Sequence, residues 1–204
     1  TDTTIVLTYF EIINYHYLSD PDSAIAICKK AEMISERLDY PKGKAESYAW
    51  MGYLVQGKGN ISLSLEYSNK SLKIFEEIGN KEAVGTALSN IGFIYKEQGI
   101  LKEALDYYGR SVKIKEEVGH KIGLAQAFEN IGDIKQKQGK IKEALDYHKR
   151  SLKINKERDN KKGIASSMNR IGMIYYDQGR INEALDYYNQ SLILQKEIGN
   201  KKGI

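Results

Sequence analysis

The sequence has 204 residues, of which 41% are hydrophobic and 28% are charged, as in ordinary soluble chains. Its formal net charge of +4 is too small to require a nucleic-acid or membrane partner, so we expect neither. A single cysteine, Cys28, excludes an internal disulfide. The longest strongly apolar run near the start, Ile5 to Phe10, is far shorter than the roughly 20 residues that span a bilayer.

The chain begins at Thr1 without a methionine or a leader. We therefore expect it to be a piece of a longer protein. Neither composition nor charge decides its compartment, and a cytoplasmic or a periplasmic location stays open.

The first eighty residues predict two pairs of helices. The first pair is expected at 5–18 and 22–38, where Asp20 can cap the second helix and Pro21 suits its first turn. The second pair is expected at 48–57 and 63–78, with a turn at Gly59-Asn60 between its helices.

From Lys81 onward the sequence repeats itself every forty residues. Three tripeptides mark the first half of each unit, namely Asn90-Ile91-Gly92, Asn130-Ile131-Gly132 and Arg170-Ile171-Gly172. The second half carries Glu-Ala-Leu-Asp-Tyr, at 103–107, 143–147 and 183–187. Self-similarity at a fixed period indicates a protein of stacked repeats.

Each unit is predicted to be helix–turn–helix. Apolar residues at 84, 88, 91 and 95 recur at helical spacing, and so do those at 101, 105, 108 and 112. Gly99 lies between the two sets and suits a left-handed turn. Asn80 and Asn160 stand where N-caps are needed. Gly92, Gly132 and Gly172 lie inside helices, which predicts close approach of the partner helix at Ala104, Ala144 and Ala184.

We therefore predict one all-α domain over residues 1–204. Its repeats span about 1–40 (degenerate), 41–80, 81–120, 121–160 and 161–200, and 201–204 starts a further repeat. Stacks of repeats normally end in a polar cap, and the sequence contains none at its C-terminal end. The face that carries Leu185, Tyr188 and Leu192 is thus expected to be open or covered by a neighbouring chain.

The units resemble the tetratricopeptide repeat. The matching residues in one unit are Ile91, Gly92, Tyr95, Gly99, Ala104, Tyr108 and Ser111. The third unit departs from this pattern with Lys135 at the aromatic position, and the second with Val55 there and Ser64 for the alanine. The period also exceeds the usual ~34 residues, which resembles the forty-residue variety of kinesin light chains, spindle-orientation scaffolds and bacterial signalling proteins. The motifs at 19–25 and 40–43 resemble the N-terminal sensor region of Bacteroidetes-type histidine kinases, cyclases and regulators.

The resemblance implies a right-handed α-solenoid of about five helix pairs that binds a protein or peptide in a concave groove lined by the first helix of each pair. Carrying the family's contact positions onto this sequence gives Trp50, Tyr53, Asn90, Phe93, Lys96, Asn130, Asp133, Lys137, Asn169, Arg170, Met173 and Tyr176. In the degenerate first pair the same register gives Tyr9, Phe10, Ile13, His16 and Tyr17.

Two features of these positions suggest ligand contacts. Asn90, Asn130 and Arg170 form one column, in which an amide or guanidinium can bond a peptide backbone or carboxylate. The alternative is that this column braces neighbouring helices. Aromatic residues such as Trp50 and Phe93 suit apolar anchors on a partner, or alternatively fill the core.

We expect no catalysis, cofactor or metal. His16, His120 and His148 are isolated in sequence and have no zinc-ligand spacing with Cys28. The favoured function is a non-catalytic binding module in a larger bacterial signalling protein. The alternatives are self-association through the open C-terminal face, control of a catalytic partner held in the groove and, last, enzymatic activity of the chain itself.

Overall fold

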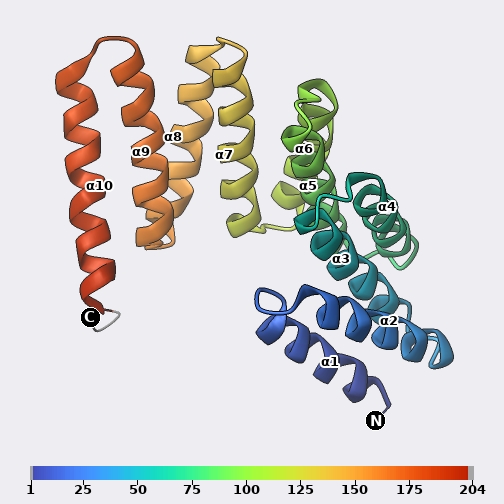
Figure 1. Cartoon of the computed structure of the whole chain (residues 1–204). Coiled ribbons are helices and arrows are strands. Elements are labelled where there is room, and N and C mark those ends of the chain that lie inside the picture. Colours follow the sequence, from blue (N-terminus) through green and yellow to red (C-terminus); the bar gives the residue numbers. More distant parts are fainter. Residues whose placement is uncertain (1, 202–204) are drawn as a thin grey trace. The chain divides into compact units, whose positions relative to one another are not determined.

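The computed structural model describes residues 2–201, with the side chains of Asp2, His16, Asn200 and Lys201 left out. This part of the chain contains ten helices and no strand (Figure 1). The helices are α1 (Asp2–His16), α2 (Pro21–Arg37), α3 (Pro41–Gly57), α4 (Ile61–Glu77), α5 (Lys81–Glu97), α6 (Leu101–Glu117), α7 (Lys121–Lys137), α8 (Ile141–Glu157), α9 (Lys161–Asp177) and α10 (Ile181–Lys201). The all-α repeat fold is therefore confirmed. The further repeat expected at 201–204 does not begin at its first residue, because Lys201 continues α10, and 202–204 lie outside the described residues.

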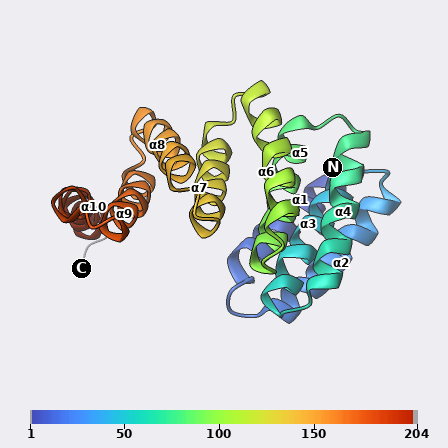
Figure 2. The same ribbon diagram turned by 90° about the horizontal axis from the view of Figure 1, so that it is seen from above.

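The helices group into two compact units, one ending at Ile114 and the other beginning at Lys115. In the first unit, α1, α2, α3, α4 and α5 are in contact in sequence order, and α1 also contacts α3. In the second unit, α7, α8, α9 and α10 are in contact in sequence order. The last two run side by side, as Figure 2 shows in a view nearly along their axes.

Several helices are capped at their N-termini by the side chains that the sequence predicted. The carboxylate of Asp20 accepts a hydrogen bond from Ser23 N, and Asn80 Oδ1 accepts one from Ala83 N, at 3.0 and 3.1 Å. Asn160 Oδ1 does the same for Gly163 N at 3.2 Å. Each bond satisfies a backbone N–H that a helix start otherwise leaves without a partner.

From α2 onward, the chain turns between successive helices through a left-handed residue. Gly99 has φ of 73°, and Gly59, Gly79, Gly119, Gly139 and Gly179 share this conformation. Asp39 and Asp159 occupy the same position with φ of 49° and 48°. The turn thus keeps its shape even where the sequence has no glycine, because the flanking helices over-determine it.

One helix boundary differs clearly from its prediction. The first helix of the second pair begins at Pro41, well before the expected Tyr48. Pro41 occupies the first turn, where its missing N–H costs nothing. Gly43 follows within that turn and is buried under Ser35 and Tyr40. These side chains pack so closely that a β-carbon on residue 43 would come within 2.5 Å of Ser35 Oγ and the Tyr40 ring.

The close approach expected at the mid-helix glycines is present, but its main partner is an aromatic ring. A β-carbon on Gly132 would lie 2.5 Å from Cε1 of His148, and one on Gly172 would lie 2.9 Å from Cε1 of Tyr188. For Gly92 the nearest atoms include Ala104 O at 3.3 Å, together with the side chains of Tyr107 and Tyr108. Ala104, Ala144 and Ala184 are nevertheless buried, since the helix pair is close-packed along its whole contact.

Candidate ligand-binding groove

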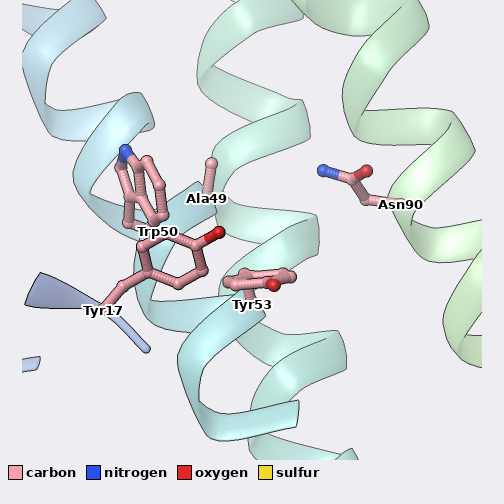
Figure 3. A pocket seen from close by; sticks show the side chains of 5 residues that line it. All are labelled: Tyr17, Ala49, Trp50, Tyr53 and Asn90. Carbon is pink, nitrogen blue, oxygen red and sulfur yellow. The ribbon is translucent and has the colours of Figure 1, made fainter. Parts of the chain in front are cut away.

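The first unit contains a hollow of about 250 Å³, called here the aromatic hollow. It is lined by Tyr17, Ala49, Trp50, Tyr53 and Asn90. Figure 3 shows three rings on one side and the Asn90 amide on the other, pointing toward Ala49. Tyr17 comes from the turn after α1, Trp50 and Tyr53 from α3, and Asn90 from α5. The hollow therefore joins α3 and α5 with the turn that follows α1.

The three rings support one another. The Tyr17 ring centroid lies 5.7 Å from that of Trp50 and 5.8 Å from that of Tyr53, and the Trp50–Tyr53 separation is 6.1 Å at an interplanar angle of 85°. Edge-to-face arrangements at such distances are favourable. More than half of the Tyr53 side chain is exposed (52%). The cluster is thus a braced apolar wall that also faces solvent.

A second, larger hollow of about 520 Å³ adjoins the first and shares Tyr17 and Tyr53 with it. Its other lining residues include Phe93 and Glu97 of α5 and Lys58, whose ammonium forms an ion pair with the carboxylate of Asp22. Phe93 is exposed. Aromatic surface therefore continues from α3 to α5.

Asn90 stands where the aromatic surface meets a polar one. It also lines a polar hollow of about 350 Å³, together with Lys42, Glu46 and Glu82. Asn90 is exposed, and within the described residues its amide makes no hydrogen bond. An amide offers two N–H donors and an acceptor oxygen. These groups are available to a ligand.

The corresponding residues of the second unit are held by intramolecular contacts. The Asn130 amide donates to Gln126 O at 3.1 Å, within its own helix. The Arg170 guanidinium donates to the carboxylate of Asp133, and its Nε lies 3.8 Å from Glu129 Oε2. The contacts of Arg170 therefore agree with the alternative in which the column braces neighbouring helices, because its ion pair joins α9 to α7.

Glu129 lies at the centre of a polar network that the sequence did not reveal. Its Oε1 accepts hydrogen bonds from Ser167 Oγ at 2.9 Å and Ser151 Oγ at 3.2 Å. Asn155, only 3% exposed, donates to Ser151 Oγ and accepts from the Asn160 amide. Because all of these groups are satisfied by one another, the network joins α7, α8 and α9.

His148 is fully buried beside this network. Its Nε2 lies 3.9 Å from Asp133 Oδ1, and within the described residues neither ring nitrogen has a hydrogen-bond partner. Burial lowers the pKa of His148 to about 4, and Arg170 acts in the same direction, while Asp133 opposes it. The ring is therefore neutral at pH 7 and packs over Gly132, at the position that Tyr108 and Tyr188 occupy in the neighbouring repeats.

The other predicted groove residues are spread over several helices and do not gather around one hollow. Lys96 places its ammonium 5.0 Å from the Phe93 ring centroid, and Lys137 is exposed at the end of α7. On α9, Met173 and Tyr176 are exposed and Asn169 is half-buried. In the first pair, Ile13 is a fully buried core residue, whereas Tyr17 lines the aromatic hollow.

The expected open face on α10 carries exposed apolar side chains. Leu185 and Leu192 are 52% and 48% exposed, whereas the equivalent Leu145 is half-buried and Leu152 is buried. Tyr188 is half-buried, because its ring covers Gly172 of α9. The exposed part of this face is thus formed by the two leucines.

Two other kinds of site are absent from the described residues. No group of three or more His, Cys, Asp or Glu side chains in this part of the chain is placed to hold a metal ion. None of the helices described is long and apolar enough to cross a membrane. Cys28 is buried, and desolvation raises the pKa of its thiol to about 12.

Comparison with known proteins defines the family. The tetratricopeptide repeat pattern matches residues 43–117 and 123–197, which is most of the chain, so this protein belongs to the tetratricopeptide repeat family. A search of curated protein sequences gave no match.

Several solved structures have the same fold at low sequence identity. BtubC from P. vanneervenii superposes with a TM-score of 0.82 at 18% identity, covering 95% of this chain and 81% of its own. A putative kinesin light chain from Podosopora anserina gives 0.73 at 14%, with coverage of 95% and 96%. The Rap conjugation gene regulator of the plasmid pLS20, solved in complex with the Phr* peptide, gives 0.75 at 17%. The match covers 92% of this chain but only 52% of that regulator, so this chain spans about half its length.

Proposed function

We propose that this protein is a non-catalytic peptide-binding module whose ligand lies on the first unit, across the aromatic hollow and Asn90. One observation carries the proposal. Asn90 is an exposed amide without a hydrogen bond to any other described residue, and it lies beside a braced aromatic wall, so that backbone and side-chain contacts are offered side by side. Aromatic anchors in hollows dominate the binding energy of many interfaces.

The comparison with the Rap regulator supports a peptide as the class of ligand, because that protein was solved with a peptide bound and has the same repeat fold. The setting we propose is the sensing or scaffolding part of a larger bacterial signalling protein, on the basis of the motifs at 19–25 and 40–43.

Trp50 provides a direct test, because it is the single tryptophan of the chain and it lines the aromatic hollow. An array of tryptophan-free peptides of random sequence identifies binders, and the best of them is titrated while Trp50 emission is followed. We expect a saturable change in emission. If peptides bind the protein without changing Trp50 emission or competing at the hollow, the proposed location is wrong.

Asn90→Ala and Asn130→Ala form a matched pair for the role of the amide. In the part of the chain that the structure describes, Asn90 has no hydrogen bond to lose, whereas the amide of Asn130 is bonded within its own helix. Loss of one or two ligand hydrogen bonds should weaken binding to Asn90→Ala by about 1–3 kcal/mol, with Asn130→Ala close to the parent. Equal affinities for the parent and Asn90→Ala would remove this amide from the site.

A second candidate function is self-association through the exposed face of α10, favoured by the exposure of Leu185 and Leu192. Light scattering over a concentration series measures it. Leu185→Glu and Leu192→Glu together should then abolish the association, because a charge on each side prevents apolar contact. We prefer this pair to Tyr188→Glu, since Tyr188 also packs on Gly172.

A further inference from the structure

We propose that the preferred ligand is an extended segment that carries a large apolar side chain and, two or three residues from it, an arginine. The apolar side chain occupies the aromatic hollow, and the arginine faces Glu46 and Glu82 in the polar hollow. This inference rests on the proposed function and specifies its ligand.

The anchor chemistry follows from the lining of the aromatic hollow. Three aromatic rings, a methyl group and an amide line it, and no charged residue does. Its volume of about 250 Å³ suits one large side chain. A charged side chain would lose its hydration there without gaining an ionic partner, whereas an apolar one would gain from leaving water.

The charge preference follows from the adjoining polar hollow. Glu46 on α3 and Glu82 on α5 both line it, with Lys42 as the single cation in its lining. The Lys42 ammonium lies 3.8 Å from Glu46 Oε1, and half of its own side chain is exposed. This ion pair is long and solvated, so it is worth little and is readily exchanged for a better one.

Glu46 should bind a new cationic partner more strongly than a fully exposed carboxylate would. Its side chain is only 31% exposed, and burial raises the pKa of this carboxyl, with Lys42 acting in the opposite direction. A carboxylate that has lost part of its hydration binds a cation more strongly. Arginine suits it better than lysine, because a planar guanidinium can bond two carboxylate oxygens at once.

The spacing between the two groups follows from helix geometry. Glu46 precedes Trp50 and Tyr53 on the same helix, so it lies about 6–10 Å from them along the axis at ~1.5 Å per residue. An extended peptide covers this distance in about two or three residues, at ~3.4 Å each. Ala49 and Asn90 line both hollows, so the two subsites are continuous across them.

A series of tryptophan-free peptides tests the inference. Each peptide has one leucine in a Gly/Ser background, and the third residue after it is Arg, Gln or Glu. Trp50 emission reports the filling of the hollow. We expect Arg to bind about three- to tenfold more tightly than Gln, and Glu more weakly than both, with the advantage of Arg shrinking in high salt.

Protein variants locate the source of the preference. In the double variant Glu46→Gln/Glu82→Gln, the Arg and Gln peptides should bind equally well. Glu103→Gln is the matched control, because Glu103 is exposed on α6 and lines none of the three hollows described above. It should keep the preference for Arg. Circular dichroism before titration verifies that each variant is folded.

The outcomes separate the two proposals. Saturable Trp50 changes with equal affinity for Arg and Gln peptides, or with Glu preferred, overturn the inference and leave the binding function standing. A preference for Arg that survives in the double variant also overturns it, because the carboxylates would not be its cause. If neither this series nor the random array perturbs Trp50, both proposals fail.

Discussion

His148 lies directly over Gly132, so closely that a β-carbon on the glycine would come within 2.5 Å of Cε1 of the imidazole. The same contact recurs with Tyr188 over Gly172 and, at slightly greater distance, with Tyr108 over Gly92. A glycine inside a helix costs about 1 kcal/mol relative to alanine. Here that cost is offset by a ring that packs against the neighbouring helix backbone.

Substitution of Gly132 should therefore destabilise the second unit. Gly132→Leu is expected to lower the free energy of unfolding by about 1–3 kcal/mol through overpacking against His148. Gly109→Ala is the control, because a β-carbon at Gly109, also inside a helix, meets nothing within 4 Å. It should raise stability by about 0.5–1 kcal/mol. Denaturant unfolding measures both, and a Gly132→Leu variant as stable as the parent would contradict the packing argument.

Acid should destabilise the protein partly through His148. Its folded pKa of about 4 lies below the ordinary value of 6.5, so the unfolded chain binds the proton more tightly. The free energy of unfolding is therefore unaffected by the protonation of His148 above pH 6.5. It decreases as the pH falls from 6.5 toward 4, by about 3 kcal/mol in total. His148→Phe should lose less stability than the parent between pH 7 and pH 4. Parallel pH profiles would contradict the assignment.

Lys115 should change the stability of the protein at alkaline pH. It is 3% exposed, its ammonium donates to Gly123 O at 3.3 Å, and burial lowers its pKa from 10.5 to about 8. The charged form is disfavoured in the fold, so stability should rise as the pH increases from 8 to 10.5.

The same burial predicts that Lys115→Met stabilises the protein at pH 7, by about 1–3 kcal/mol, since no charge is then desolvated. Lys113→Met is the matched control, because Lys113 is exposed on the same helix. It should change stability by less than about 0.5 kcal/mol. Thermal melts at pH 7 and pH 10 compare the variants, and a destabilised Lys115→Met would show that the ammonium is a net stabiliser.

The left-handed turns offer a stabilising substitution in each unit. Asp39 and Asp159 hold φ of 49° and 48° at the position that glycine occupies elsewhere. Asp39→Gly and Asp159→Gly should each raise the free energy of unfolding by about 1 kcal/mol, because glycine adopts this conformation without strain. The reverse change, Gly99→Asp, should lower it by a similar amount. Denaturant midpoints measure all three.

Helices, caps and turns were predictable because their causes are local. The apolar spacing along 84–95 and the short reach of Asn80 to Ala83 N depend on a few neighbouring residues. Repetition of these signals also predicted the family. The start of α3 at Pro41 was missed, because the residues that bury its first turn come from the preceding pair.

The polar interior was not predictable. Phe75, Lys115 and Asn155 occupy one position in successive repeats, and all three are buried. The sequence alone gives no reason to bury a lysine there. Burial is possible because the facing residue of the next repeat, Gly123 for Lys115 and Gly163 for Asn155, leaves room for a longer side chain.

The column of Asn90, Asn130 and Arg170 shows where the sequence stops being sufficient. Its periodicity determined that these residues share one register and one face of their helices. Whether a ligand can reach each of them was decided by contacts that the sequence does not show. The Asn130 amide is bonded to Gln126 O of its own helix, whereas for Arg170 and Asn90 the difference lies in the side chain contributed by the preceding repeat. For Arg170 that side chain is Asp133, which binds its guanidinium. The equivalent neighbour of Asn90 is Tyr53, which packs against Tyr17 and Trp50 instead and leaves the amide free beside the aromatic hollow.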